Sequence, residues 1–157
     1  MTTLEYFKAL QSSSFGRYIG NLDHLIHASF QLLHITGMLL LLTTIVLLSL
    51  RAFGLVLRQV PLAEIAHATR YLVWTGLTFS LISGFLMLAP SATNYYANDF
   101  FWDKLVLLAL ALLVHVGIFR KATSSSASSA FVTQLSAVAS LVLWFGVAFA
   151  GRFIGFF

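Results

Sequence analysis

The chain has 157 residues, of which 59% are hydrophobic and only 9% are charged, and its formal net charge is +4. This composition lies far outside the range of soluble globular proteins, and the few basic residues are spread along the chain rather than gathered as a nucleic-acid partner would require. Cysteine is absent, so a metal or cofactor would have to be held by His, Met, carboxylate or amide groups.

The first twenty residues contain charged residues and no long apolar run, so they do not resemble a cleavable signal peptide. We expect residues 1–20 to form an interfacial segment in which residues 4–19 are a short amphipathic helix on the outer membrane surface. The side chains expected to face lipid are Tyr6, Phe7, Leu10 and Phe15.

Four apolar stretches follow, and each suits a helix that crosses a bilayer, which takes about 20 residues. These spans cover about residues 26–50, 71–89, 100–119 and 130–154. Pro90 is expected to end the second span, because proline cannot continue a helix. The sequence therefore predicts an all-α fold, a single transmembrane domain over residues 1–157 with four helices in an up-down-up-down bundle.

Basic residues mark two of the three connections between these spans. Arg51, Arg58 and Arg70 surround the first connection, and Arg120 and Lys121 lie in the third. Short loops rich in Lys and Arg stay on the cytoplasmic side of a membrane. Both termini are therefore predicted to lie outside.

One face of the first span is polar. At about 100° per residue its polar residues fall within about 80° of one another, and lipid would penalise such a stripe. It should therefore face the bundle interior, a cavity or a partner protein. These groups either hydrogen-bond neighbouring helices and do nothing else, or bind a ligand. The stripe consists of His24, His27, Gln31, His34 and Met38.

Cationic side chains of two other spans could join this face. Lys104 and His115 share a face of the third span, and Arg152 lies near the outer end of the fourth. Lys104 and Arg152 either extend to water at the outer interface or bind an anionic group. Together with His34 they would form a positive outer-side pocket. The candidate cofactor-binding residues are His34, His27, Gln31, Lys104, Arg152 and His115, and the candidate metal ligands are His24, His27 and His34.

Two further patterns indicate packing. A largely aromatic stripe on the second span is predicted to belong to the core. A face of small residues on the fourth span would let helix backbones approach closely. The aromatic stripe is His67, Tyr71, Trp74, Thr78 and Phe85, and the small-residue face is Ser136, Ser140 and Gly151.

Several short phrases, taken in order, resemble an uncharacterised family of small four-helix bacterial inner-membrane proteins, with a looser likeness to the CopD copper-resistance domain. The likeness covers most of the chain and implies a bacterial inner-membrane location, with both termini periplasmic. Gln31 stands where the family usually has an acidic residue, three positions before His34. The phrases are His34-Ile-Thr-Gly37, Leu50-Arg51-Ala-Phe-Gly54-Leu55, Ser83-Gly84-Phe-Leu86, Phe101-Trp-Asp-Lys104, Ser140-Leu-Val-Leu-Trp144 and Gly151-Arg152-Phe-Ile154.

Three functions remain open at this point. The first is electron transfer with a b-type haem or a quinone. His34 lies about 25 Å above Arg51, whereas His115 lies only about 7.5 Å from Arg120, so the two histidines cannot share one haem. The second is copper binding or transport, as the CopD likeness implies, with His24 and His27 one turn apart at the outer mouth.

The third function is that of a non-catalytic scaffold subunit, with no cofactor, whose polar stripe meets other membrane subunits or a second copy of the chain. No serine stands in a nucleophile-elbow context, and we expect an electron-transfer or accessory subunit rather than a stand-alone enzyme. As the bound cofactor, haem or quinone is slightly preferred to copper.

Overall fold

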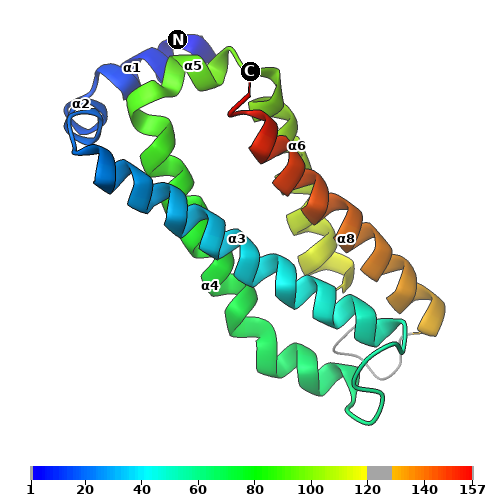
Figure 1. The fold of residues 1–157 in the computed structure, drawn as a ribbon. Coiled ribbons are helices and arrows are strands. Elements are labelled where there is room, and N and C mark those ends of the chain that lie inside the picture. The colour runs from blue at the N-terminus through cyan, green and yellow to red at the C-terminus, as the bar shows by residue number, and fades with distance from the viewer. Residues whose placement is uncertain (1, 120–128, 157) are drawn as a thin grey trace.

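The structure is a computed structural model that describes residues 2–119 and 129–156. Within these ranges the secondary structure is helical and contains no strand. Consecutive long helices run antiparallel, and the two ends of the chain lie at the same end of the bundle (Figure 1). The predicted all-α four-helix bundle is confirmed. Its long helices are α3 (His24–Ala52), α4 (Leu62–Leu88), α6 (Asp99–Val114) and α8 (Ala130–Phe153).

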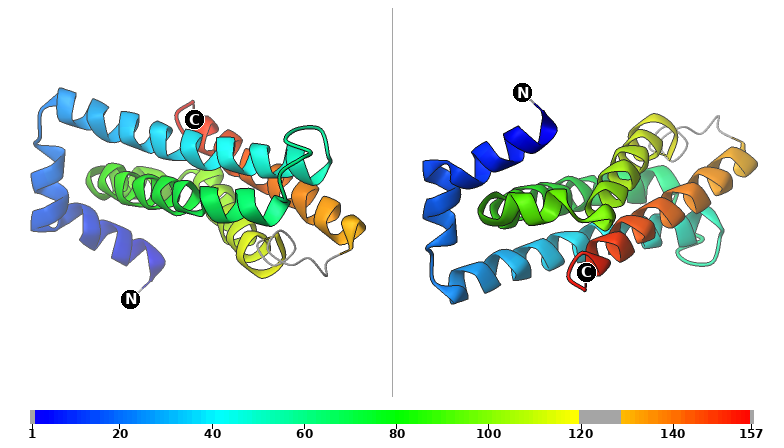
Figure 2. Two further views of the ribbon diagram at one scale, coloured as in Figure 1. Left: turned by 90° about the horizontal axis from the view of Figure 1, so that it is seen from below. Right: turned by 90° about the horizontal axis from the view of Figure 1, so that it is seen from above.

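These four helices give the described part of the chain four segments long and apolar enough to cross a membrane. They pack as two antiparallel pairs, α3 with α4 and α6 with α8, and α3 also packs along α8. Figure 2 shows the same arrangement along the bundle from two sides. A lipid environment suits this fold, because the outward faces of all four helices are largely apolar.

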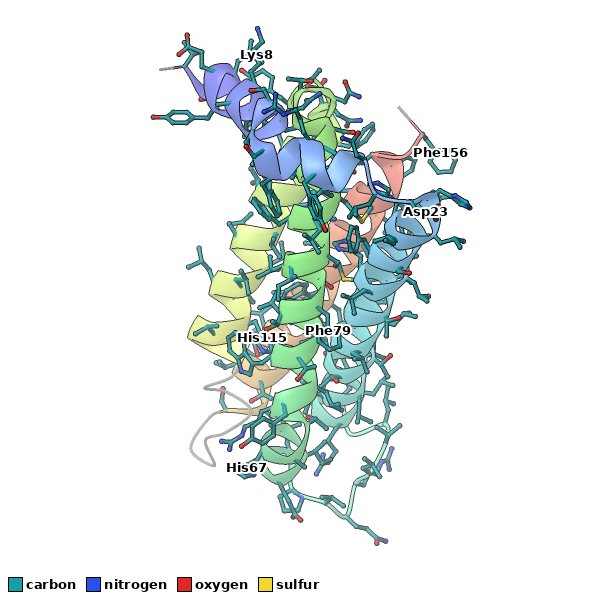
Figure 3. The ribbon with its side chains drawn as sticks, turned by 90° about the vertical axis from the view of Figure 1, so that its left-hand side faces the viewer. Lys8, Asp23, His67, Phe79, His115 and Phe156 are labelled. Atoms are coloured by element: carbon teal, nitrogen blue, oxygen red, sulfur yellow. The ribbon has the colours of Figure 1, made fainter. Side chains whose placement is uncertain are left out.

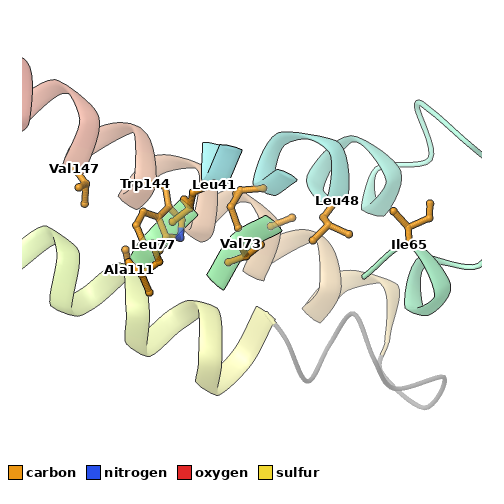
Figure 4. Packing of buried hydrophobic residues seen from close by; sticks show 10 residues of the cluster. Leu41, Leu48, Ile65, Val73, Leu77, Ala111, Trp144 and Val147 are labelled. Atoms are coloured by element: carbon orange, nitrogen blue, oxygen red, sulfur yellow. The ribbon is translucent and has the colours of Figure 1, made fainter. Parts of the chain in front are cut away.

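The core lies where α3, α4 and α8 meet, and α6 adds Ala111 to it (Figure 4). Lipid tails are as apolar as leucine, so these helices associate mainly through close van der Waals packing and polar contacts rather than through the hydrophobic effect. The cluster of buried residues is Leu41, Ile45, Leu48, Ile65, Val73, Leu77, Ala111, Ala137, Trp144 and Val147.

α3 and α4 approach each other closely at Gly37 and Gly76. A Cβ atom added to Gly37 would lie 2.6 Å from the carbonyl oxygen of Gly76, and one added to Gly76 would lie 2.5 Å from that of Gly37. Only glycine fits on both sides of this contact. The two backbones therefore touch, as small residues allow in membrane helices.

The N-terminal segment forms two helices instead of the single one predicted, α1 (Thr3–Ser12) and α2 (Ser14–Gly20). The chain breaks at Ser13, whose hydroxyl oxygen accepts a hydrogen bond from the backbone N–H of Gly16 at 3.0 Å. Serine is a favoured N-cap, so it can end one helix and start the next. A Cβ atom on Gly16 would lie 2.5 Å from the carbonyl oxygen of Leu10, so the sharp turn also requires glycine there.

The prediction that this segment turns its aromatic residues toward lipid was wrong for Phe7. Its ring packs against those of Tyr96, Phe101 and Trp102, with centroids 5.3 to 6.0 Å apart. Phe15 is partly exposed but stacks on Phe85 of α4 at 5.9 Å. The segment therefore docks onto the bundle end, where aromatic residues of α5 and α6 receive it.

The second span starts earlier than predicted, whereas the end of α4 at Leu88 agrees with the predicted end before Pro90. α4 begins at Leu62, nine residues before the expected start, since Pro61 occupies the N-cap position. Past Pro90 the chain does not open into a loop but continues as a 3-10 turn, η1 (Ala89–Ser91), and a short helix, α5 (Ala92–Tyr96). Proline at the start of a turn loses no hydrogen bond, because its missing N–H would have had no partner there.

The third span ends in a π-helical turn, η2 (His115–Phe119). Most of the third connection, including the basic pair Arg120 and Lys121, lies outside the described residues. The Ser129 hydroxyl oxygen caps α8 by accepting from the N–H of Val132.

The aromatic stripe of α4 was wrongly predicted to belong to the core. Tyr71 is 65% exposed, Phe85 48% and Trp74 39%, and His67 and Thr78 are exposed as well. The lipid-facing and core-facing sides of a membrane helix are equally apolar, so the period of the pattern does not tell them apart.

Candidate functional site

The site centres on a hydrogen bond between His34 of α3 and Lys104 of α6. The Nζ atom of Lys104 lies 3.3 Å from Nε2 of His34, and both side chains are half-buried. A lysine ammonium carries donors only, so Lys104 donates this bond and Nε2 accepts it. Two polar residues from separate spans thus meet inside an apolar bundle.

The other ring nitrogen of His34 faces α4. Nδ1 lies 3.2 Å from Oγ of Ser83, and the Ser83 hydroxyl donates its own proton to the carbonyl of Phe79. The Ser83 oxygen is therefore left to accept from Nδ1, which places the proton of the neutral imidazole on Nδ1 and the lone pair on Nε2. A directed line of hydrogen bonds runs from Lys104 through His34 and Ser83 to the backbone of α4.

A second serine of α4 holds the backbone of α3 at the same level. The Ser80 hydroxyl donates to the carbonyl oxygen of His34 at 3.3 Å. Ser80 and Ser83 are both buried and lie three residues apart, so they share one face of α4. The position of the His34 ring is thus fixed through its backbone and through Nδ1.

Two glycines give the paired side chains their room. A Cβ atom on Gly84 of α4 would lie 3.2 Å from Cε1 of His34, and one on Gly151 of α8 would lie 3.1 Å from Nζ of Lys104. Both values are tighter than ordinary contacts to Cβ, so a larger residue at either place would displace the ring or the ammonium. All four long helices therefore contribute to the site.

The ammonium of Lys104 makes no ion pair with a carboxylate among the residues that the structure describes. The adjacent carboxylate, Asp103, instead lines a groove of about 450 Å³ on the α6–α8 surface, between residues such as Leu107 and Ala150. A cation in a membrane-spanning segment without an opposite charge is costly, so such residues usually mark a ligand or ion site. The geometry favours a ligand that offers an oxygen acceptor.

The structure brings only part of the predicted pocket together. Arg152 is exposed and places its guanidinium 4.3 Å above the ring of Phe156, away from the pair. Gln31 is exposed, and His27 is half-buried against the edge of Phe30. These three side chains do not take part in the contacts around His34.

His115 is buried but lies apart from this pair, on η2. In Figure 3 it is found in the half of the bundle that ends at His67, whereas Lys8, Asp23 and Phe156 mark the opposite end. The eleven residues between Lys104 and His115 correspond to about 16 Å along a helix. The different membrane depths predicted for His34 and His115 therefore agree with the fold.

The three candidate metal ligands also occupy different surroundings. The side chain of His24 is 86% exposed, with Nδ1 3.4 Å from Asp23, while His34 lies inside the bundle about 15 Å further along α3. Within the described ranges, no three His, Asp or Glu side chains form a group that could hold a metal ion.

The sequence interpretation missed Ser80, and it quoted Ser83 only as part of a family phrase. A single serine in a long apolar stretch is common in membrane helices, because its hydroxyl can bond to the backbone of its own helix. The available signal was the spacing of Ser80, Ser83 and Gly84, which puts small and polar residues on one face of the second span.

The comparisons with known proteins add a family but no function. The sequence model described as "Family of unknown function (DUF6644)" matches residues 6–157, so the chain belongs to this family. The predicted resemblance to an uncharacterised family is confirmed, and the likeness to CopD stays a prediction. No curated protein and no solved structure matches the chain.

Proposed function

We propose that this member of the DUF6644 family binds a quinone at the His34–Lys104 pair and serves electron transfer in the bacterial inner membrane. The observation that carries the proposal is the 3.3 Å contact between the Lys104 ammonium and the His34 imidazole, where no carboxylate of residues 2–119 or 129–156 pairs with the ammonium. A quinone carbonyl oxygen is a neutral acceptor that can enter a membrane, and a charge-assisted bond from Lys104 would hold it.

The chemistry of the pair fits quinone reduction. A quinone that receives electrons from a partner redox protein also takes up protons at its oxygens. Lys104 can donate one from its ammonium, and the Nε2 lone pair of His34 can take up a second proton from solvent and pass it to the quinone while Nδ1–H stays bonded to Ser83. The chain itself would supply binding and protons, and the partner would supply electrons.

Haem is less well supported than quinone. An axial histidine needs one ring nitrogen for the iron, and both ring nitrogens of His34 already face protein partners. Copper is supported still less, since the exposed His24 and the interior His34 would have to act at separate places.

The proposed orientation places both termini in the periplasm and the pair toward the periplasmic half of the membrane. Arg51, Arg58 and Arg70 lie at the end of the bundle opposite the termini, around the connection of α3 to α4. Positive residues of short connections favour the cytoplasm.

A scaffold role is a second candidate, and the exposure of Gln31 favours it. An amide side chain turned toward lipid is unfavourable, whereas one that meets another helix can be hydrogen-bonded. A partner membrane protein or a second copy of the chain would provide this contact. The two candidates are compatible, because an electron donor has to dock somewhere on the bundle.

The test is binding of a short-chain ubiquinone to the protein purified in detergent, measured by equilibrium dialysis for the wild type, His34→Ala and His67→Ala. We expect the wild type and His67→Ala to bind and His34→Ala to lose binding, since His67 is exposed and far from the pair. Equal binding by all three proteins would refute the site.

Oxidised and dithionite-reduced absorption spectra of the same samples, together with metal analysis, distinguish the remaining cofactors. A Soret band lost in His34→Ala would replace quinone by haem. Copper retained by the wild type and lost on replacing His24 would favour the copper alternative.

A further inference from the structure

Buried hydroxyl groups in this bundle fall into two classes. Most donate a hydrogen bond to a backbone carbonyl, usually that of their own helix, as expected in a membrane helix. Ser49 and Ser140 are fully buried and have no hydrogen-bond partner among the described residues. The satisfied hydroxyls are those of Thr44, Ser80, Ser83, Thr133 and Ser136.

Ser140 differs from Ser49 because a second buried polar group without a partner among the described residues, the indole of Trp144, lies one turn further along α8. Trp144 is 1% exposed, and its indole Nε1 has no partner within the described part of the chain. Side chains of a helix lean toward its N-terminus, so the indole of Trp144 leans over the turn that carries Ser140. A buried donor and a buried hydroxyl thus share one patch of the core.

Small residues lie next to this patch. Ala137 precedes Ser140 by one turn on the same face of α8, Ala111 faces it from α6, and both are fully buried. Figure 4 shows Trp144 between Leu41, Leu77 and Ala111.

Leaving such groups unbonded costs about 1–3 kcal/mol each, and proteins meet this cost with internal water. One water molecule that bonds to two groups spans about 5.6 Å, since each bond measures about 2.8 Å. Ser140 and Trp144 lie one turn apart on α8 and the indole leans toward Ser140, so one water molecule can serve both groups.

We propose that the Ser140–Trp144 turn of α8 binds an internal water molecule, which accepts a hydrogen bond from the Trp144 indole N–H and bonds to the Ser140 hydroxyl. Seven positions, a rise of about 10 Å, separate Trp144 from Gly151, the neighbour of Lys104, and the water lies beyond Trp144 on the side of Ser140. The water site is therefore separate from the His34–Lys104 pair and independent of the proposed quinone function.

The test is hydrogen–deuterium exchange of the Trp144 indole N–H, followed by NMR of the ¹⁵N-labelled full chain in lipid nanodiscs. The chain has three tryptophans, Trp74, Trp102 and Trp144, and a Trp144→Phe sample assigns the signal. In a dry core this proton exchanges only when the bundle opens, in step with the backbone amides of Ala137 and Val147. We expect it to exchange faster than those amides by an order of magnitude or more.

Ser136→Ala is the matched control for Ser140→Ala. Both serines are buried on the same face of α8, but the Ser136 hydroxyl is already bonded to the carbonyl of Thr133 at 2.8 Å. We expect Ser140→Ala to slow indole exchange to the rate of the amides and Ser136→Ala to leave it fast.

Indole exchange in step with the amides in the wild type would overturn the proposal, and this comparison needs no variant that might fail to fold. Fast exchange that persists in Ser140→Ala would overturn it too, because the water would then not depend on Ser140. Neither result depends on quinone binding, so the two proposals fail separately.

Discussion

The ammonium of Lys104 lies 3.3 Å from Nε2 of His34, a residue 70 positions earlier in the chain, and this bond links α6 to α3. If the lysine serves a ligand rather than the fold, Lys104→Met should weaken quinone binding by about ten- to a hundredfold, the value of a charge-assisted hydrogen bond. The thermal stability of the ligand-free protein should stay equal or rise, because a partly buried ammonium without a carboxylate is removed. Dialysis and thermal unfolding in detergent measure both quantities.

A structural role for Lys104 predicts the reverse pattern. Unfolding would then occur at a lower temperature in Lys104→Met while the remaining folded protein bound quinone normally. Lys8→Met is the control, since Lys8 lies on α1 at the end of the bundle and should change neither quantity.

A substitution at Gly151 can displace the Lys104 ammonium without altering its charge. In Gly151→Ala the new methyl group would lie 3.1 Å from Nζ and 3.3 Å from Cε of Lys104. The flexible end of the lysine can move aside, so we expect normal folding and weaker quinone binding. In Gly155→Ala the nearest atoms, all of Arg152, lie at 3.7 Å, and this variant should bind like the wild type. Equal affinity of the two variants would mean that the ligand does not contact Lys104.

The contact of Gly37 with Gly76 predicts a large loss of stability. In Gly37→Ala the added methyl group meets the backbone of α4, which cannot move aside, so α3 and α4 must separate. We expect a cost of about 3 kcal/mol in the free energy of unfolding, the upper range for overpacking. Denaturant titration of the detergent-solubilised protein measures it.

Gly146→Ala provides the comparison for that experiment. Its methyl group would meet only Leu107, at ordinary contact distances of 3.4 and 3.6 Å. Alanine is the better helix former by up to about 1 kcal/mol, so this variant should equal or exceed the wild type in stability. A Gly37→Ala variant as stable as Gly146→Ala would mean that the two backbones do not touch.

The docking of α1 onto the bundle end predicts a change in proteolysis. In Phe7→Ala the contacts with Tyr96, Phe101 and Trp102 disappear. Loss of about 1.4 kcal/mol of docking free energy should raise tryptic cleavage after Lys8 and Arg17 by about tenfold. Tyr6→Ala, with a side chain already 61% exposed, should be cleaved like the wild type. Cleavage unchanged in both would place α1 off the bundle.

Much of the fold could be predicted because a bilayer leaves few choices for an apolar chain. Helix length and rise predict the four spans and the depth of His34 in the membrane. They also make Lys104 a candidate residue of the site. The direction in which each helix face points could not be predicted, because lipid and core are equally apolar. The outward stripe of Tyr71, Trp74 and Phe85 is the clearest example.

The same limit applies to the site. A polar stripe on the first span predicted several inward-facing groups, yet Gln31 is exposed and the partner of His34 on α4 is Ser83. That contact depends on the crossing point of α3 and α4, which is set by Gly37 and Gly76. Single-sequence patterns give the face of a residue on its own helix but not the register between two helices.

His34 and Lys104 belong to different halves of the bundle, since α3 and α4 form one closely packed pair while α6 and α8 form the other. A molecule whose oxygen entered between Nε2 and Nζ would act as a spacer at one end of the joint between these halves. Farther along the bundle, α3 and α8 stay in contact around Trp144. An occupied site would therefore bridge the two helix pairs through the ligand, where the ligand-free protein joins them through the His34–Lys104 hydrogen bond.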